Sequence, residues 1–163
     1  MKVEVKCPSD CSQDELKVFK DLVVEAGEVQ TESLRFLIVR AVSLIFLYDD
    51  SGDLVGIAAV KRPNEGYKQK IFSRAKSPEN SDTYNYELGW IVVREKYRGN
   101  HLSRYLVEAA LKVTDEAKIY ATTRATNLAM RRTNERYGFR VSGKPYSSNR
   151  RNDNYELLLF VRG

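Results

Sequence analysis

One segment of the sequence combines residue types that could bind an anion. An aromatic and β-branched run, 84–93, is followed by a short polar turn and then by apolar residues at helical spacing. A strand that turns directly into a helix brings unpaired backbone N–H groups, and the positive end of the helix dipole, toward one point. Gly99 permits a tight bend, and Arg98 adds a permanent positive charge. The segment therefore predicts a phosphate or pyrophosphate site, with a plain strand–turn–helix connection as the alternative.

The sequence is poor in residues for metal binding and for nucleophilic catalysis. Cys7 and Cys11 are its two cysteines, and His101 is its one histidine. A structural zinc ion generally needs four such ligands. A serine or cysteine nucleophile usually takes its base from a histidine. We therefore expect no metal, reduced thiols and a reaction that does not depend on a nucleophile–histidine pair.

Length and composition indicate one globular domain over residues 1–163. Of the 163 residues, 42% are hydrophobic and 30% are charged, which is typical of a folded domain. Arg40 interrupts the longest apolar stretch, 36–48, which is too short for a membrane span of ~18 residues. The first residues alternate with charges and do not form the apolar segment of a signal peptide. We expect a cytoplasmic protein with no membrane partner.

The charge balance attracts phosphates only weakly. The chain has 27 Lys and Arg and 22 Asp and Glu, a net charge of +5, which does not by itself indicate a nucleic-acid-binding protein. Basic residues do gather near the C-terminus, at Arg131, Arg132, Arg136, Arg140, Lys144, Arg150 and Arg151. They form either a solvated surface or a phosphate contact. Since no nucleic-acid recognition motif accompanies them, we expect no nucleic-acid partner.

Hydrophobic periodicity predicts a mixed α/β protein. Ser12 and Glu15 have the spacing of a capping box at the start of the first helix. Two polar segments, 63–82 and 142–154, separate apolar elements and are candidates for facing a substrate, the first with a short helix near 67–72. The predicted elements, in order, are a strand at 3–5, helices at 12–27 and 34–41, a hairpin of 44–48 and 54–61, a strand at 84–93, a helix at 102–113, a strand at 119–123, a helix at 127–136, and strands at 139–141 and 155–161.

Two motifs in this order resemble those of the GNAT superfamily of N-acetyltransferases. Arg98-Gly-Asn-His-Leu-Ser103 is similar to the family's acetyl-CoA loop, Arg/Gln-x-x-Gly-x-Gly/Ala, and 87–93 is similar to the strand before it. The segment 127–139 resembles the second motif, Asn-x-x-Ala-x-x-x-Tyr-x-x-x-Gly-Phe. The order of elements agrees along the whole chain. The resemblance implies a GNAT-like acyl-CoA N-acyltransferase fold, with a central, mostly antiparallel sheet flanked by helices.

The resemblance also implies acetyl-CoA as the co-substrate and suggests where it binds. Backbone N–H groups near Ile91, Val92 and Val93 would hold the pantetheine and polarise the thioester oxygen. Asn127 and Asn134 would add side-chain contacts, and one of Arg131 and Arg132 would meet the 3′-phosphate or lie on a solvated helix face. The pyrophosphate would be held by the loop residues Arg98, Gly99, Asn100, His101, Leu102, Ser103 and Arg104.

His101 and Ser103 stand where the family usually has small residues. Ser103 is small and can donate a hydrogen bond. For His101, its place in the anion loop favours a structural or phosphate-contact role over a catalytic one.

Two catalytic residues follow from the same resemblance. Glu87 stands where some members of the family place a general base, and its apolar neighbours would favour its protonated form. The alternative is that Glu87 faces solvent or pairs with an arginine. Asn134 stands where the second motif has a tyrosine that protonates the leaving thiolate, and an amide cannot do so. Tyr137 is the first candidate to replace it, with Tyr120, Tyr146 or solvent as alternatives.

These residues predict an acetyl-CoA-dependent N-acetyltransferase that moves an acetyl group directly to an amine. The alternative is a catalytically silent module on the same fold that binds CoA or an acidic partner. The acceptor stays open, because substrate choice would lie in 63–82, in 142–154 and in the region after Leu34. A monomer and a homodimer both remain open.

Overall fold

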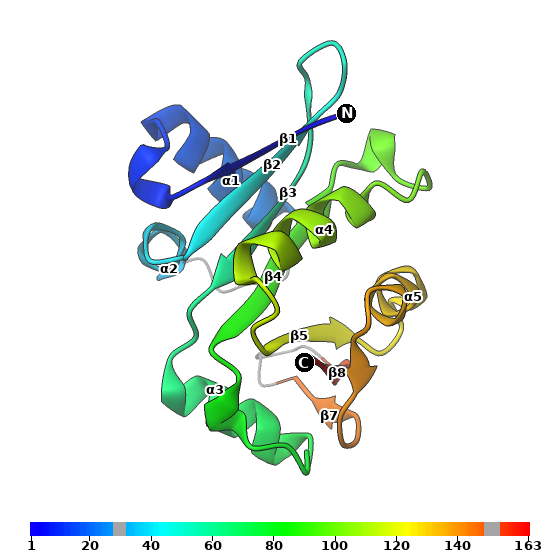
Figure 1. Ribbon diagram of the computed structural model, residues 1–163. Coiled ribbons are helices and arrows are strands. Elements are labelled where there is room, and N and C mark those ends of the chain that lie inside the picture. Colours follow the sequence, from blue (N-terminus) through cyan, green and yellow to red (C-terminus); the bar gives the residue numbers. More distant parts are fainter. Residues whose placement is uncertain (28–31, 149–153) are drawn as a thin grey trace. The chain divides into compact units, whose positions relative to one another are not determined.

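The computed structural model describes residues 1–27, 32–148 and 154–163 of the chain. Its strands form one mostly antiparallel sheet in the order β1-β2-β3-β4-β5-β8-β6, with β7 beside β8 (Figure 1). Helices flank these strands, so the predicted mixed α/β fold is confirmed. The chain divides into two compact units: Met1–Arg62 with Leu88–Asp115, and Pro63–Glu87 with Glu116–Gly163.

The first unit contains the elements predicted for the N-terminal half. They are β1 (Lys2–Lys6), α1 (Gln13–Glu25), α2 (Leu34–Val39), β2 (Ser43–Tyr48), β3 (Leu54–Lys61), the larger part of β4 (Tyr86–Val93) and α4 (Ser103–Thr114), with short 3-10 helices η1 (Pro8–Asp10) and η3 (Glu95–Tyr97). The predicted capping box is confirmed, because the Ser12 hydroxyl accepts from the Glu15 N–H at 3.1 Å and the Glu15 carboxylate accepts from the Ser12 N–H at 2.8 Å. Two N–H groups at the start of α1 are thereby satisfied.

Strand β2 is buried on both faces, which explains its uninterrupted apolar sequence. Leu44 and Phe46 share a core cluster with Leu16 and Phe19 of α1. Helix α4 packs against β2 and β3. Figure 1 shows α1 and α4 on opposite sides of these strands. Burial of apolar surface, at roughly 25 cal/mol per Å², is the main stabilising contribution of this layered core.

The second unit is built on β8, which pairs antiparallel with β5, β6 and β7. Strand β5 in turn pairs in parallel with the start of β4, where Tyr86 lies opposite Ile119 and Glu87 lies opposite Tyr120. The elements of this unit are α3 (Glu65–Arg74), the 3-10 helix η2 (Ser81–Thr83), the start of β4, β5 (Ile119–Arg124), α5 (Leu128–Arg136), β6 (Arg140–Val141), β7 (Tyr146–Ser147) and β8 (Glu156–Arg162).

The polar segment 63–82 is more ordered than its composition suggests. The short helix expected near 67–72 is confirmed and extends over the whole of α3. Ile71 and Phe72 enter the core cluster of the second unit. Lys68 is only 1% exposed, and its ammonium donates to the Tyr84 carbonyl at 3.1 Å. The segment therefore contributes to the core instead of forming a loop.

A second set of contacts joins this segment to residues 140–147, and we call residues 74–79 and 140–147 together the junction. The hydroxyls of Ser77 and Ser142 lie 2.6 Å apart, and the Lys144 N–H donates to the Ala75 carbonyl at 2.6 Å. Arg140 pairs with Glu79 at 2.5 Å, and the Arg74 guanidinium donates to the Ser147 carbonyl. The two segments predicted to face a substrate are thus bound to each other within the second unit.

The segment 142–154 was predicted as a turn-rich link between strands, and the structure adds a short strand within it, β7 at Tyr146–Ser147. The strand is two residues long and too short for periodicity to reveal it. Arg150 and Arg151 of the predicted basic cluster lie outside the described residues. None of the helices in the described ranges is both long and apolar enough to cross a membrane.

Candidate active site

The predicted anion loop has a backbone that turns sharply before α4. Gly99 has φ of +83° and His101 has φ of +55°, so both residues lie in the left-handed region. Glycine adopts this region freely, whereas an L residue such as histidine is strained there by about 1 kcal/mol. The chain leaves η3, bends at these two residues and enters α4 at Ser103. The predicted sharp turn between the strand and the helix is confirmed.

The same bend leaves a row of backbone donors. In the described part of the chain, no group accepts a hydrogen bond from the N–H of Gly99, Asn100, His101 or Leu102. Two residues farther along, the N–H groups serve the first turn of the helix, since Arg104 donates to the His101 carbonyl at 3.3 Å and Tyr105 donates to that of Leu102 at 3.2 Å. Four successive donors next to the positive end of a helix can hold an anion.

Side chains of the loop hold its shape. The Arg98 Nε donates to the Val93 carbonyl at 2.9 Å, and the Asn100 amide donates to the carbonyls of Tyr97 and Arg98 at 3.2 and 3.3 Å. Arg104 lies over the Tyr105 ring and donates to its hydroxyl at 3.0 Å. Arg98 and Asn100, which were predicted to contact the cofactor, therefore also fix the backbone that would do so.

The loop is also anchored to the β2–β3 turn through Tyr97. Its hydroxyl donates to the Asp49 carboxylate at 2.8 Å, which lowers the pKa of Asp49 below its usual 3.8, with further donation from the N–H groups of Asp53 and Ser51. A lowered carboxyl pKa stabilises the fold at neutral pH, and this stabilisation disappears as the pH falls through the folded-state pKa.

We expect Tyr97→Phe to return the pKa of Asp49 toward 3.8, because it removes the largest cause of the shift while keeping the ring. The variant should be less stable than wild type at pH 7, and the difference should shrink at acidic pH, once Asp49 is protonated in both folded and unfolded chains. Carboxyl NMR titration and urea denaturation at the two pH values measure these effects. A stability difference that does not depend on pH would contradict the prediction.

We expect His101→Gly to stabilise the protein by about 1 kcal/mol, because glycine relieves the left-handed strain. CoA affinity should stay within about threefold, since the backbone N–H groups remain in place. The control is Gly99→Ala, which puts a Cβ at φ of +83° in open space and should cost about 1 kcal/mol. Denaturation and calorimetric titration with CoA measure the two quantities. A tenfold loss of affinity in His101→Gly would instead assign phosphate binding to the imidazole.

The backbone of strand β4 leaves the extended conformation just before residues 91–93, the predicted acyl site. Trp90 has φ of +51°, an outlier for a bulky residue within a strand. Its ring packs edge-on against Phe19 at 6.0 Å, and the Lys61 ammonium lies 4.7 Å from the ring centroid. Beyond it, Val92 is buried in the core cluster of the first unit, so only its backbone could meet a cofactor. Ile91 and Val93 are half-buried.

Glu87 lies in the second unit and is only 3% exposed. Its register partner Tyr120 is fully buried and donates its hydroxyl to Glu87 Oε2 at 3.3 Å. Burial, and then the charge of Glu87, raise the pKa of Tyr120, so this phenol remains a proton donor to the carboxylate. Because Glu87 is buried, its solvent-facing alternative is excluded.

Tyr146 provides another buried phenol in the same core cluster as Tyr120. Its hydroxyl has no hydrogen-bond partner in the described part of the protein. Burial, and then the charge of Glu87, raise the pKa of Tyr146. The sequence did not show that Tyr120 would contact Glu87, because a cross-strand register has no local signal.

Helix α5 carries the remaining predicted residues. Asn127 is exposed and caps the helix, accepting from the Met130 N–H at 3.1 Å. Asn134 is fully buried and donates its amide to the Thr123 hydroxyl at 3.1 Å, whereas its Oδ1 has no partner within the described residues. Tyr137 is half-buried at the end of the helix, and its carbonyl accepts from Arg162 at 2.9 Å.

The predicted basic cluster has mixed environments. Arg131 donates to the Ala125 carbonyl at 2.9 Å, and Arg140 pairs with Glu79. Arg132 and Arg136 are exposed on α5. The predicted site residues divide between the units: Ile91 to Val93 and Arg98 to Arg104 belong to the first, and Glu87, Asn127, Asn134 and Tyr137 belong to the second.

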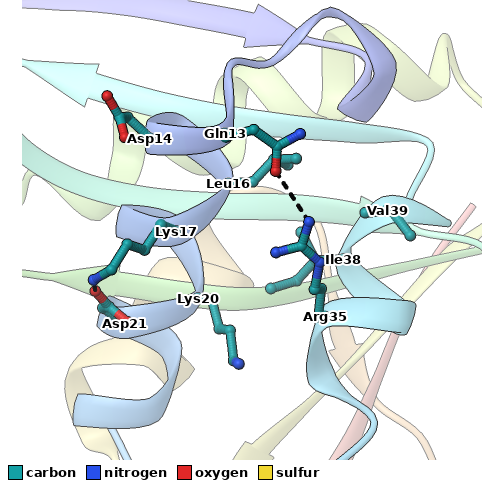
Figure 2. Close-up of a pocket in the computed structure, with 9 residues that line it drawn as sticks. All are labelled: Gln13, Asp14, Leu16, Lys17, Lys20, Asp21, Arg35, Ile38 and Val39. Atoms are coloured by element: carbon teal, nitrogen blue, oxygen red, sulfur yellow. Dashed lines mark hydrogen bonds and ion pairs between the residues drawn. The ribbon is translucent and has the colours of Figure 1, made fainter.

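A groove of about 380 Å³ lies between α1 and α2 in the first unit (Figure 2). Arg35 reaches across it and donates to the Gln13 side chain at 3.0 Å, and Lys17 pairs with Asp21 at 2.6 Å. None of the predicted site residues is among those that line it, which are Gln13, Asp14, Leu16, Lys17, Lys20, Asp21, Arg35, Ile38 and Val39. In the described ranges, no three His, Cys, Asp or Glu side chains gather in a way that could hold a metal ion.

Known proteins resemble the chain in family and in fold. The acetyltransferase (GNAT) family profile matches residues 13–139. Similar solved structures include an acyl-CoA N-acyltransferase from Pseudomonas aeruginosa, with 17% identity, 99% of each chain covered and a TM-score of 0.71. Escherichia coli ElaA has 14% identity, 99% coverage of each chain and a TM-score of 0.71.

Arabidopsis thaliana NAA60 in complex with acetyl-CoA has 14% identity, 98% coverage of each chain and a TM-score of 0.67. At these identities the likeness shows the fold. No protein of curated function matches the sequence significantly.

Proposed function

Because the chain belongs to the GNAT acetyltransferase family, we propose that it is an acetyl-CoA-dependent N-acetyltransferase that transfers the acetyl group directly to an amine. The observation that carries the proposal is the row of N–H groups from Gly99 to Leu102 in front of α4. Such a row suits a diphosphate, which CoA contains. The proposal takes residues 1–163 as one acetyltransferase domain in the cytoplasm, monomeric or homodimeric, with no nucleic-acid, membrane or metal partner.

The loop before α4 provides most of the co-substrate contacts in this proposal. The loop from Arg98 to Arg104 holds the pyrophosphate, and Asn127 and Asn134 are proposed as further contacts. Backbone N–H groups near Ile91, Val92 and Val93 stabilise the negative charge that develops on the thioester oxygen, a contribution of about 3 kcal/mol in comparable sites. Holding amine and thioester in line supplies much of the remaining rate.

Glu87 is the proposed general base. An alkylamine has a pKa of about 10.4 and arrives protonated, so a proton must leave before nitrogen attacks the acetyl carbon. Glu87 takes this proton, the new C–N bond forms, and the C–S bond breaks. The leaving thiolate takes a proton from the Tyr137 hydroxyl, because Asn134 has no acidic proton. The proton that the nitrogen loses as it becomes an amide returns to the Tyr137 phenolate through solvent.

A catalytically silent module that binds CoA or an acidic partner is the second candidate. The observation that favours it is Asn134, which is buried and bonded to Thr123 where the family motif has a tyrosine. This arrangement ties α5 to β5 and leaves the thiolate without the usual acid. Binding without turnover would follow if Tyr137 and solvent fail to replace it.

The two candidates are separated by titrating CoA calorimetrically and by measuring thiol release from acetyl-CoA with a panel of amines. The proposal expects CoA to bind with micromolar affinity and at least one amine to release thiol. Binding with no release for any amine would favour the silent module. Absence of CoA binding below millimolar concentration would contradict both.

A further inference from the structure

We propose that Tyr120 is the positioning residue of Glu87, holding its carboxylate in the one orientation in which it accepts a proton. The inference rests on the proposed N-acetyltransferase function and adds a residue to its site. Tyr120 lies on β5, directly opposite Glu87 on β4, and its hydroxyl is 3.3 Å from Oε2. Both residues belong to the second unit.

The hydrogen bond is important because both side chains are buried. Glu87 is 3% exposed and Tyr120 is 0% exposed, so water does little to stabilise a charge at this place. A buried carboxylate favours its neutral form unless donors stabilise the ion. The Tyr120 phenol is such a donor, and the register of two paired strands fixes its position. Without this donor, the direction of Oε2 would be less firmly fixed.

The second unit also offers a matched contrast. Tyr84 lies in the same core cluster and is equally buried, but its hydroxyl donates to Glu79 at 3.0 Å. Tyr120 and Tyr84 therefore share aromatic packing and a carboxylate partner. They differ in whether that partner is the proposed base. This contrast separates a role in catalysis from a role in packing.

The test compares Tyr120→Phe with Tyr84→Phe by measuring kcat and the KM for the amine separately. In Tyr120→Phe we expect kcat to fall about tenfold while KM and CoA affinity change less than about threefold, because the carboxylate has lost the donor that fixes its orientation. Tyr84→Phe should keep kcat within about threefold of wild type. A Tyr120→Phe enzyme with the kcat of wild type would overturn the proposal, and so would equal losses of kcat in the two variants.

A second measurement does not depend on activity. Unfolding of wild type, Tyr120→Phe, Glu87→Met and the double variant forms a double-mutant cycle, in which methionine keeps the length of the side chain but removes the acceptor. The double variant avoids a buried carboxylate without its donor. We expect the two changes to be coupled by about tenfold in the unfolding equilibrium constant, or about 1.4 kcal/mol.

If wild type transfers no acetyl group, the proposed function fails, and coupling would still support the holding role. Additive effects in the cycle would overturn that role whether or not the enzyme is active.

Discussion

Glu87→Gln should lower kcat/KM for acetyl transfer by about 100-fold or more while CoA affinity changes less than about threefold. An amide cannot accept the proton that the amine must lose, and general base catalysis contributes about 10²–10⁴-fold. The buried side chain keeps its size, and its amide oxygen can still accept from the Tyr120 hydroxyl. Steady-state kinetics with the best amine of the panel and calorimetric titration of CoA measure the two quantities.

The control is Glu65→Gln, which changes a carboxylate on α3 that pairs with Lys68 at 3.1 Å and is itself mostly exposed. This variant should keep activity within about threefold, because its carboxylate lies on the surface. Full activity in Glu87→Gln would refute the assignment of the base. Equal losses in the two variants would point to a general effect on the second unit.

Gly143→Ala should destabilise the protein by about 3 kcal/mol or more. Gly143 has φ of +80°, and a Cβ there would lie 2.0 Å from the Ala75 carbonyl oxygen. The left-handed backbone costs an alanine about 1–2 kcal/mol, and the overlap costs a further 1–3 kcal/mol. For a chain of this size, the melting temperature should fall by about 10 °C. Urea denaturation and thermal unfolding measure the change.

Gly52→Ala is the matched control. Gly52 has nearly the same backbone, with φ of +86°, but a Cβ there meets nothing within 4 Å. It should lose only about 1–2 kcal/mol for the backbone. Equal effects at the two glycines would show that the backbone of the junction can shift to accept a Cβ at little cost. The close contact with Ala75 would then contribute little to stability.

Local patterns made most of the fold predictable. The strand around Val3 and Val5 and the Ser12 capping box each follow from patterns within a few residues, and both are present in the structure. Element ends differ from the prediction by a few residues, because fraying and capping decide them. Strand β7 was missed because two residues carry no period, and its pairing with β8 depends on residues nine and eleven positions away.

The features of the predicted site also differ in whether local sequence could reveal them. The anion loop could be predicted because its donors are consecutive backbone groups whose geometry follows from Gly99 and the start of α4. The partner of Glu87 could not, because Tyr120 is 33 positions away and meets it through strand register. The burial of Lys68 could not be predicted either, because its sequence neighbours are polar and its acceptor, the Tyr84 carbonyl, is 16 positions away.

The junction has a consequence for how new acceptor preferences could arise. Residues 74–79 and 140–147 contact each other through backbone carbonyls, paired hydroxyls and an ion pair. A chimera that inherits one of these segments from a relative would face an unmatched partner and fold poorly. Variants that acquire a new specificity should therefore exchange the two segments as a linked pair.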